Sequence, residues 1–113
     1  MAQWNGQYTG NSHATKIKDL EETLTHAVFV FREAGSAEEI QAKGKSVRKL
    51  AEKLLNARLK FLKAKIYDAE PVSERDEAKR AVQIENLRQH EAKARHDGIN
   101  GILNEFKVAD LIE

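Results

Sequence analysis

The sequence contains no cysteine and a single proline in 113 residues. Without cysteine the chain cannot form a disulfide, a thiolate nucleophile or a Cys-ligated zinc or iron–sulfur site. No apolar run approaches the ~18–20 residues that cross a bilayer, and residues 1–12 lack the basic start and apolar stretch of a signal peptide. We therefore expect a cytoplasmic protein that does not enter the membrane.

Charged residues, by contrast, make up 33% of the chain, a composition typical of long, solvated helices. The length suits one domain, so residues 1–113 are expected to form a single helical domain. The apolar fraction of 41% is slightly low for a globular domain. Some helical surface is therefore expected to be covered only in an oligomer or a complex.

Apolar residues recur at helical spacing in the first third of the chain, up to Gly35. They fall on one face of an ideal helix: Ile17, Leu20, Leu24, Ala27, Val28, Phe31 and Ala34. Gly35 is a natural C-terminal stop, so we predict a helix that begins near Ser12 or Thr15 and ends there. Phe29 points away from the apolar face, towards another element of the chain or a contact surface.

The next segment predicts the longest helix. Ser36 and Glu39 form an S-x-x-E capping box, and the helix can run to about Asp68, before Pro71. Gly44 costs about 1 kcal/mol relative to alanine in a helix interior, so a bend or break at that residue stays open. A broad apolar face makes this the core helix.

The remaining segments are less regular. A third helix is predicted to begin at Ser73; it is rich in charge and poor in large aliphatic residues, so it buries little. Gly98 and Gly101 interrupt it, and the apolar residues that follow predict a short terminal helix. Residues 1–12, with two glycines and two asparagines, predict an irregular arm. The expected fold is all-α, an antiparallel three- or four-helix bundle with a long central helix.

The net charge of +1 conceals a segregated pattern. Residues 43–65 contain nine basic residues and one acidic residue, which gives the segment +8 and the rest of the chain −7. On an ideal helix, five lysines share a stripe about 80° wide, opposite the apolar face: Lys45, Lys49, Lys53, Lys60 and Lys63. The stripe is either a solvated face, partly neutralised by acidic neighbours, or a contact surface for nucleic acid phosphates or an acidic protein.

Arg58 differs from the other basic residues, because its position lies in the middle of the apolar face of the same helix. A charge buried there needs a hydrogen-bonded counter-charge unless its stem carries it out to water. Glu91 lies on the more apolar side of the third helix. We therefore predict a buried ion pair between Arg58 and Glu91.

Familiar catalytic and metal motifs are absent from the sequence. Residues 43–46 contain the G-K-S of a phosphate-binding loop, but Glu39 stands where the motif requires glycine. His90 and Glu91 start like a zinc-protease motif, yet the next histidine, His96, comes six residues after His90 rather than four. We expect no enzyme activity, no metal site and no cofactor.

Two functions follow as expectations. The first is a non-catalytic interaction module that binds a partner protein, as an adaptor, inhibitor or small regulator, through Trp4, Tyr8 and Phe29. Self-association would also cover the poorly buried third helix. The alternative is low-specificity binding of nucleic acid through the lysine stripe, because lysines contact phosphates and no base-reading module is present.

Overall fold

The computed structural model describes residues 8–69 and 77–112. They form three α-helices and one 3-10 helix: α1 (Tyr8–Arg32), α2 (Ala37–Ala69), α3 (Glu77–Glu105) and η2 (Ala109–Leu111). This part of the chain contains no strand, which confirms the expected all-α class. None of its helices is long and apolar enough to cross a membrane.

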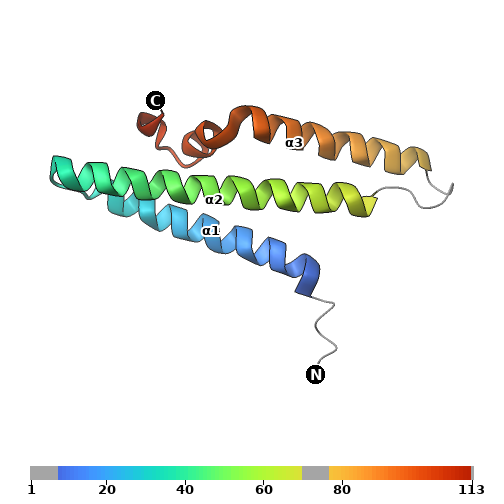
Figure 1. Ribbon diagram of the computed structural model, residues 1–113, viewed down its shortest axis with the longest axis horizontal. Helices are drawn as coiled ribbons and strands as arrows, with labels where there is room; N and C mark the ends of the chain where they lie inside the picture. The colour runs from blue at the N-terminus through green and yellow to red at the C-terminus, as the bar shows by residue number, and fades with distance from the viewer. Residues whose placement is uncertain (1–7, 70–76, 113) are drawn as a thin grey trace, which may run out of the picture.

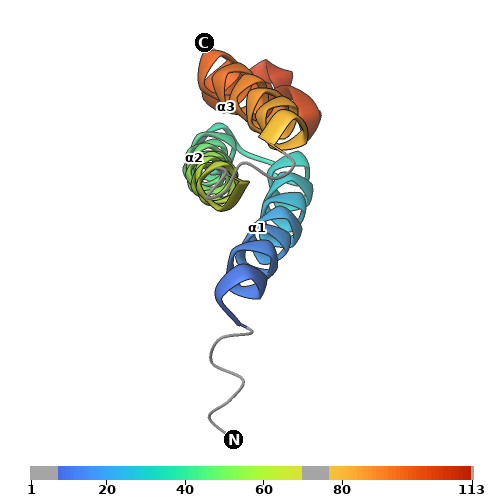
Figure 2. The ribbon, with the colours of Figure 1, turned by 90° about the vertical axis from the view of Figure 1, so that its right-hand side faces the viewer.

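The helices form a thin, elongated layer. Successive helices run in opposite directions, and α2 passes between α1 and α3 and packs against both (Figure 1). The principal dimensions are 61 × 39 × 14 Å. The radius of gyration is 17.8 Å, compared with about 13 Å for a compact domain of this length. Figure 2, which looks along the layer, shows that α1 and α3 leave one side of α2 uncovered.

α1 is longer at its start than the sequence suggested. It begins at Tyr8, so the prediction of an irregular arm is wrong for residues 8–12, and residues 1–7 lie outside the described part. The helix ends at Arg32, where a tighter turn follows: the Ala34 amide donates to the Phe31 carbonyl oxygen at 3.2 Å.

α2 begins at the predicted cap. The Glu39 amide donates to Ser36 Oγ at 3.1 Å, which satisfies one of the free donors at the helix start. The helix then runs for 33 residues without a break at Gly44. Gly44 is buried, and a Cβ added to it would lie 3.2 Å from Leu111 Cδ2 and 3.5 Å from Phe31 Cε1. Glycine at this position therefore lets the C-terminal segment approach α2 closely.

α3 contains a kink at Gly98, as the sequence predicted. Gly98 has φ 59° and ψ −147°, a backbone conformation that residues other than glycine rarely adopt. Gly101 stays within the helix. The predicted start of this helix at Ser73 lies outside the described residues. Before the kink none of the helix is buried, whereas Ile102 and Leu103 after it are.

The hydrophobic core lies at one end of the layer, where the last turns of α1, the first half of α2 and the chain after Gly98 meet (Figure 1). We call this the closed end. Its buried residues are Leu24, Phe31, Val47, Ala51, Leu54, Ile102, Leu103 and Val108. At the opposite end, the open end, α1 before Leu20 diverges from the second half of α2, whereas α3 before Gly98 runs alongside it with no fully buried residue (Figure 1).

Candidate functional site

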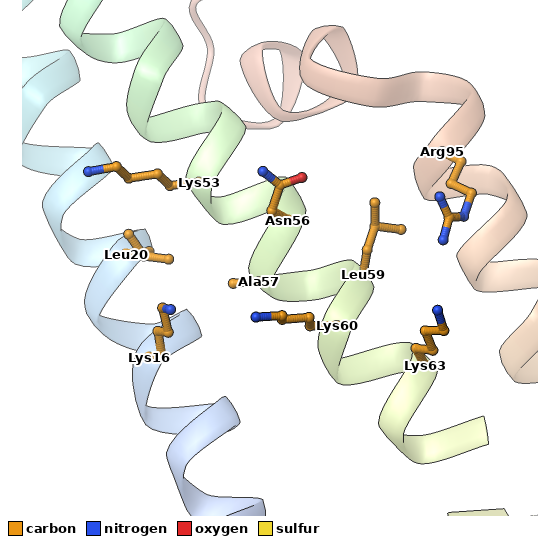
Figure 3. Close-up of a pocket in the computed structure, with 9 residues that line it drawn as sticks. All are labelled: Lys16, Leu20, Lys53, Asn56, Ala57, Leu59, Lys60, Lys63 and Arg95. Carbon is orange, nitrogen blue, oxygen red and sulfur yellow. The ribbon is translucent and has the colours of Figure 1, made fainter. Parts of the chain in front are cut away.

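A groove of about 790 Å³ lies over residues 53–63 of α2, towards the open end (Figure 3). All three helices contribute to its lining, α2 most of all. The lining residues, which we call the basic groove, are Lys16, Leu20, Lys53, Asn56, Ala57, Leu59, Lys60, Lys63 and Arg95. Five of the nine are cations and none is a carboxylate, so the groove can hold an anionic ligand.

The spacing of the α2 lysines places them on the face opposite the core. Val47 and Leu54 point into the core, and Lys53, Lys60 and Lys63 lie about half a turn from them on the helix. In Figure 3 the first two lysines extend towards α1, while the third lies on the α3 side. The hydrophobic packing of one face of α2 therefore orients the basic face towards solvent.

α1 and α3 supply the remaining two cations of the basic groove. Lys16 comes from α1 and lies beside Lys60, whereas Arg95 comes from α3 and its guanidinium points towards Lys63 (Figure 3). Leu20 and Leu59 are half-buried and Ala57 is buried, so part of the lining between the cations is apolar.

Four of the five cations have no structural partner within the described residues. No hydrogen bond or ion pair to that part of the chain engages Lys16, Lys53, Lys60 or Lys63. Arg95 differs, because its Nη2 lies 3.0 Å from Glu91 Oε2. Among the described residues, anions that enter the groove would therefore compete with a carboxylate only at Arg95.

The predicted lysine stripe is exposed along its whole length. Three of its members line the groove, whereas Lys45 and Lys49 continue the same face of α2 towards the closed end. Sequence reasoning missed Lys16 and Arg95, because nothing in the chain pattern shows which turns of α1 and α3 come beside α2. It also passed over Asn56, an amide in the middle of the basic face.

The predicted ion pair between Arg58 and Glu91 is wrong. Arg58 instead bridges the other two helices: its Nη1 lies 2.7 Å from Glu105 Oε1, and its Nη2 lies 2.8 Å from Glu21 Oε2. The expectation that Arg58 needs counter-charges holds, because its side chain is only 25% exposed. The part of α3 that lies beside Arg58 is its last turn, after the Gly98 kink. Glu105 therefore forms the ion pair that was expected for Glu91.

The bridge shifts the pKa values of Arg58 and Glu105. Hydrogen bonds to Glu105 and Glu21 raise the pKa of Arg58 above its usual value, against the opposing effect of partial burial. The same hydrogen bond to Arg58 lowers the pKa of Glu105. Both groups therefore stay charged at neutral pH, and the bridge ties α1, α2 and α3 together.

The aromatic residues expected to contact a protein partner are only partly described. Phe29 lies on the outer side of α1 and is 63% exposed. Tyr8 starts α1, but its side chain and all of Trp4 lie outside what the structure describes. The described residues therefore place one member of this set, and they do not assemble a common surface from it.

Residues 8–69 and 77–112 contain no group of three His, Asp or Glu side chains positioned to hold a metal ion. Comparison of the chain with protein-family models, curated proteins and solved structures gives no match. The geometry and charge of the basic groove are therefore the features that bear on function.

Proposed function

We propose that the protein is a non-catalytic, cytoplasmic module that binds nucleic acid through the basic groove, with little sequence preference. The observation that carries the proposal is the gathering of five cations from three helices around one groove, with no carboxylate among the described residues that line it. Of the two functions expected from the sequence, this is the one for which the described residues provide a contiguous surface.

The arrangement of the cations favours a regularly charged polymer. From Lys45 to Lys63 the basic face of α2 extends over 18 residues, or about 27 Å at 1.5 Å per residue. A nucleic acid presents phosphates at regular intervals along such a row. An acidic protein surface presents its carboxylates at irregular positions, so it would match a row of this length less well.

The identity of the cations favours contact with phosphates over reading of bases. Lysine is a compact point charge, whereas specific readout of guanine depends mainly on the bidentate geometry of arginine. The one arginine of the groove, Arg95, is already paired with Glu91. Contacts of this kind position the polymer and carry no sequence information.

The test is fluorescence anisotropy of labelled 20-mer duplex DNA and single-stranded RNA at low and physiological salt. We expect dissociation constants in the range of about 1–100 µM, as is usual for binding without sequence preference. If the four lysines of the groove contact phosphates, the slope of log K against log salt should be about −3. No binding at low salt would overturn the proposal.

A matched pair of variants separates the groove from the overall charge. The groove variant replaces Lys53, Lys60 and Lys63 by glutamate, and the control variant replaces three exposed lysines elsewhere, Lys18, Lys79 and Lys93. Each replacement changes the charge by −2, so both variants move from +1 to −5. We expect the groove variant to lose more than tenfold in affinity and the control to lose much less. Equal losses would contradict the groove as the site.

Competition with polyglutamate tests the acidic-protein alternative. A nucleic acid bound through spaced phosphates should resist displacement by polyglutamate at equal charge concentration. If polyglutamate displaces the nucleic acid completely under these conditions, an acidic protein replaces nucleic acid as the ligand of the groove, and the partner-protein function regains first place.

A further inference from the structure

Tyr67 is an exposed aromatic residue on the basic face of α2. Its side chain is among the most exposed large apolar groups of the described residues, at 77%. Within that part of the chain no hydrogen bond or ring contact engages it. It lies two residues before the end of α2 at Ala69, next to the open end.

The helical register aligns Tyr67 with the lysines of the groove. It follows Lys63 by four residues and Lys60 by seven, so it lies one and two turns further along the same face. Lys49, 18 residues earlier, lies about five full turns away at the same angle. The ring therefore extends the row of cations rather than packing against a neighbouring helix.

Phe61, the other aromatic residue of this half of α2, shows the contrast. Its ring lies 6.4 Å from the ring of His13, and Lys65 Nζ lies 5.2 Å from its centre. Phe61 is also half-buried, on the side of α2 that faces the other helices. It has a structural role in the fold, whereas the Tyr67 ring makes no such contact within the described residues and is 77% exposed.

We propose that Tyr67 is a stacking platform for an unpaired base, which makes the basic groove prefer single-stranded over duplex nucleic acid. This inference rests on the proposed function. Phosphates would contact Lys60 and Lys63 while the adjacent base lies flat on the phenol ring. In a duplex the bases are stacked on one another and cannot reach the ring. One base stacked on an aromatic side chain raises affinity by about fivefold to a hundredfold, with little dependence on the base.

The experiment compares labelled dT20 with a 20-mer duplex by anisotropy, for the wild type, Tyr67→Ala and Tyr67→Phe. We expect Tyr67→Ala to lose at least fivefold in affinity for dT20 and less than twofold for the duplex. Tyr67→Phe keeps the ring, so it should retain wild-type affinity for both. Phe29→Ala, which removes another strongly exposed ring from a face outside the groove, is the control and should change neither.

A second probe separates stacking from other effects of the substitution. A 20-mer that carries the sugar–phosphate backbone without bases should bind the wild type as weakly as dT20 binds Tyr67→Ala. If the backbone oligomer binds the wild type as tightly as dT20 does, the stacking proposal is wrong.

The outcomes distinguish this inference from the function on which it rests. If Tyr67→Ala leaves both affinities unchanged, or lowers both equally, while the groove variant abolishes binding, the stacking role is overturned and the proposed function stands. If the wild type binds neither probe at low salt, both fail.

Discussion

The closed end and the open end are built from the same three helices, but they differ in how much apolar surface is buried. At the closed end Leu24, Val47, Leu54 and Val108 are completely buried. At the open end the only buried residues of α2 after Arg58 are Ile66 and Ala69, and no residue of α3 before Gly98 is buried. Burial of apolar surface is the main source of folding free energy, so the closed end supplies most of the stability.

The C-terminal segment reinforces the closed end. Arg32 donates to both carboxylate oxygens of Asp110, at 3.0 and 2.9 Å, and to the Lys107 carbonyl oxygen at 2.7 Å. Arg48 donates to the Leu111 carbonyl oxygen. These contacts fix the last residues of the chain across the ends of α1 and α2, beside the core.

The comparison shows how a small helical chain can leave a strongly charged face free. Because the closed end holds the helices together, the lysines of the open half need not form ion pairs to maintain the fold. Arg58, which ties Glu21 and Glu105 to α2, lies between the region that folds and the region that we propose binds.

Replacing Leu54 by alanine should have the largest effect on stability. Its side chain is fully buried, so we expect the free energy of unfolding to fall by about 2–5 kcal/mol. Leu87→Ala is the matched change at the open end; Leu87 is only half-buried, and we expect a loss below about 1 kcal/mol. Urea denaturation followed by circular dichroism measures both.

Equal losses of unfolding free energy at Leu54 and Leu87 would contradict a difference in stability between the closed end and the open end. They would mean that α3 before Gly98 is covered in solution, as the self-association expected from the sequence would provide. Sedimentation equilibrium across a tenfold range of protein concentration would then show a dimer or a larger oligomer.

Replacing Arg58 by methionine should have an intermediate effect. The change keeps most of the aliphatic stem but removes the guanidinium that bridges Glu21 and Glu105, so we expect a loss of about 1–3 kcal/mol at pH 7. Arg95→Met removes a cation whose side chain is 58% exposed, and its effect should stay below about 0.5 kcal/mol.

The pH dependence sharpens the test of the bridge. The pKa of Glu105 is lower in the folded protein, because its carboxylate accepts hydrogen bonds from Arg58. The resulting stabilisation is complete above the ordinary glutamate pKa and is lost as the pH falls towards the lowered value. Between about pH 5 and about pH 3 the wild type should therefore lose more stability than Arg58→Met. Parallel curves would contradict the role of this pair.

Local signals in the sequence predicted the elements well. The cap at Ser36 fixed the start of α2, and the apolar period placed Val47 and Leu54 in the core. The position of Arg58 on the apolar face correctly implied a need for counter-charges. These features depend on residues close together in the chain, where helical geometry alone determines the neighbours.

The contacts between helices could not be predicted in this way. Glu105 is 47 residues from Arg58 in the chain, and it reaches that residue only because of the kink at Gly98 and the level at which α3 meets α2. Arg95, which precedes the kink, joins the groove because of the level at which α3 lies beside α2. The register of Tyr67 can also be found from the sequence, but a stripe defined by charge alone does not include this ring.

Glu91→Gln should have the smallest effect on stability and still change binding. Its ion pair with Arg95 joins residues four apart on a helix, and such pairs contribute about 0.3–0.5 kcal/mol. Without the carboxylate, Arg95 is free to contact a phosphate, so we expect tighter binding of nucleic acid and a salt slope steeper by about 1.

The control for this change is Glu85→Gln, which alters the charge equally on the same helix. Glu85 accepts a hydrogen bond from Gln89 and lies outside the groove, so its substitution should leave the salt slope unchanged. A steeper slope with both variants would indicate an effect of overall charge, and an unchanged slope with Glu91→Gln would remove Arg95 from the binding surface. If the closed end stabilises the fold and the basic groove binds nucleic acid, Glu91→Gln alone should steepen the salt slope and leave the stability nearly constant.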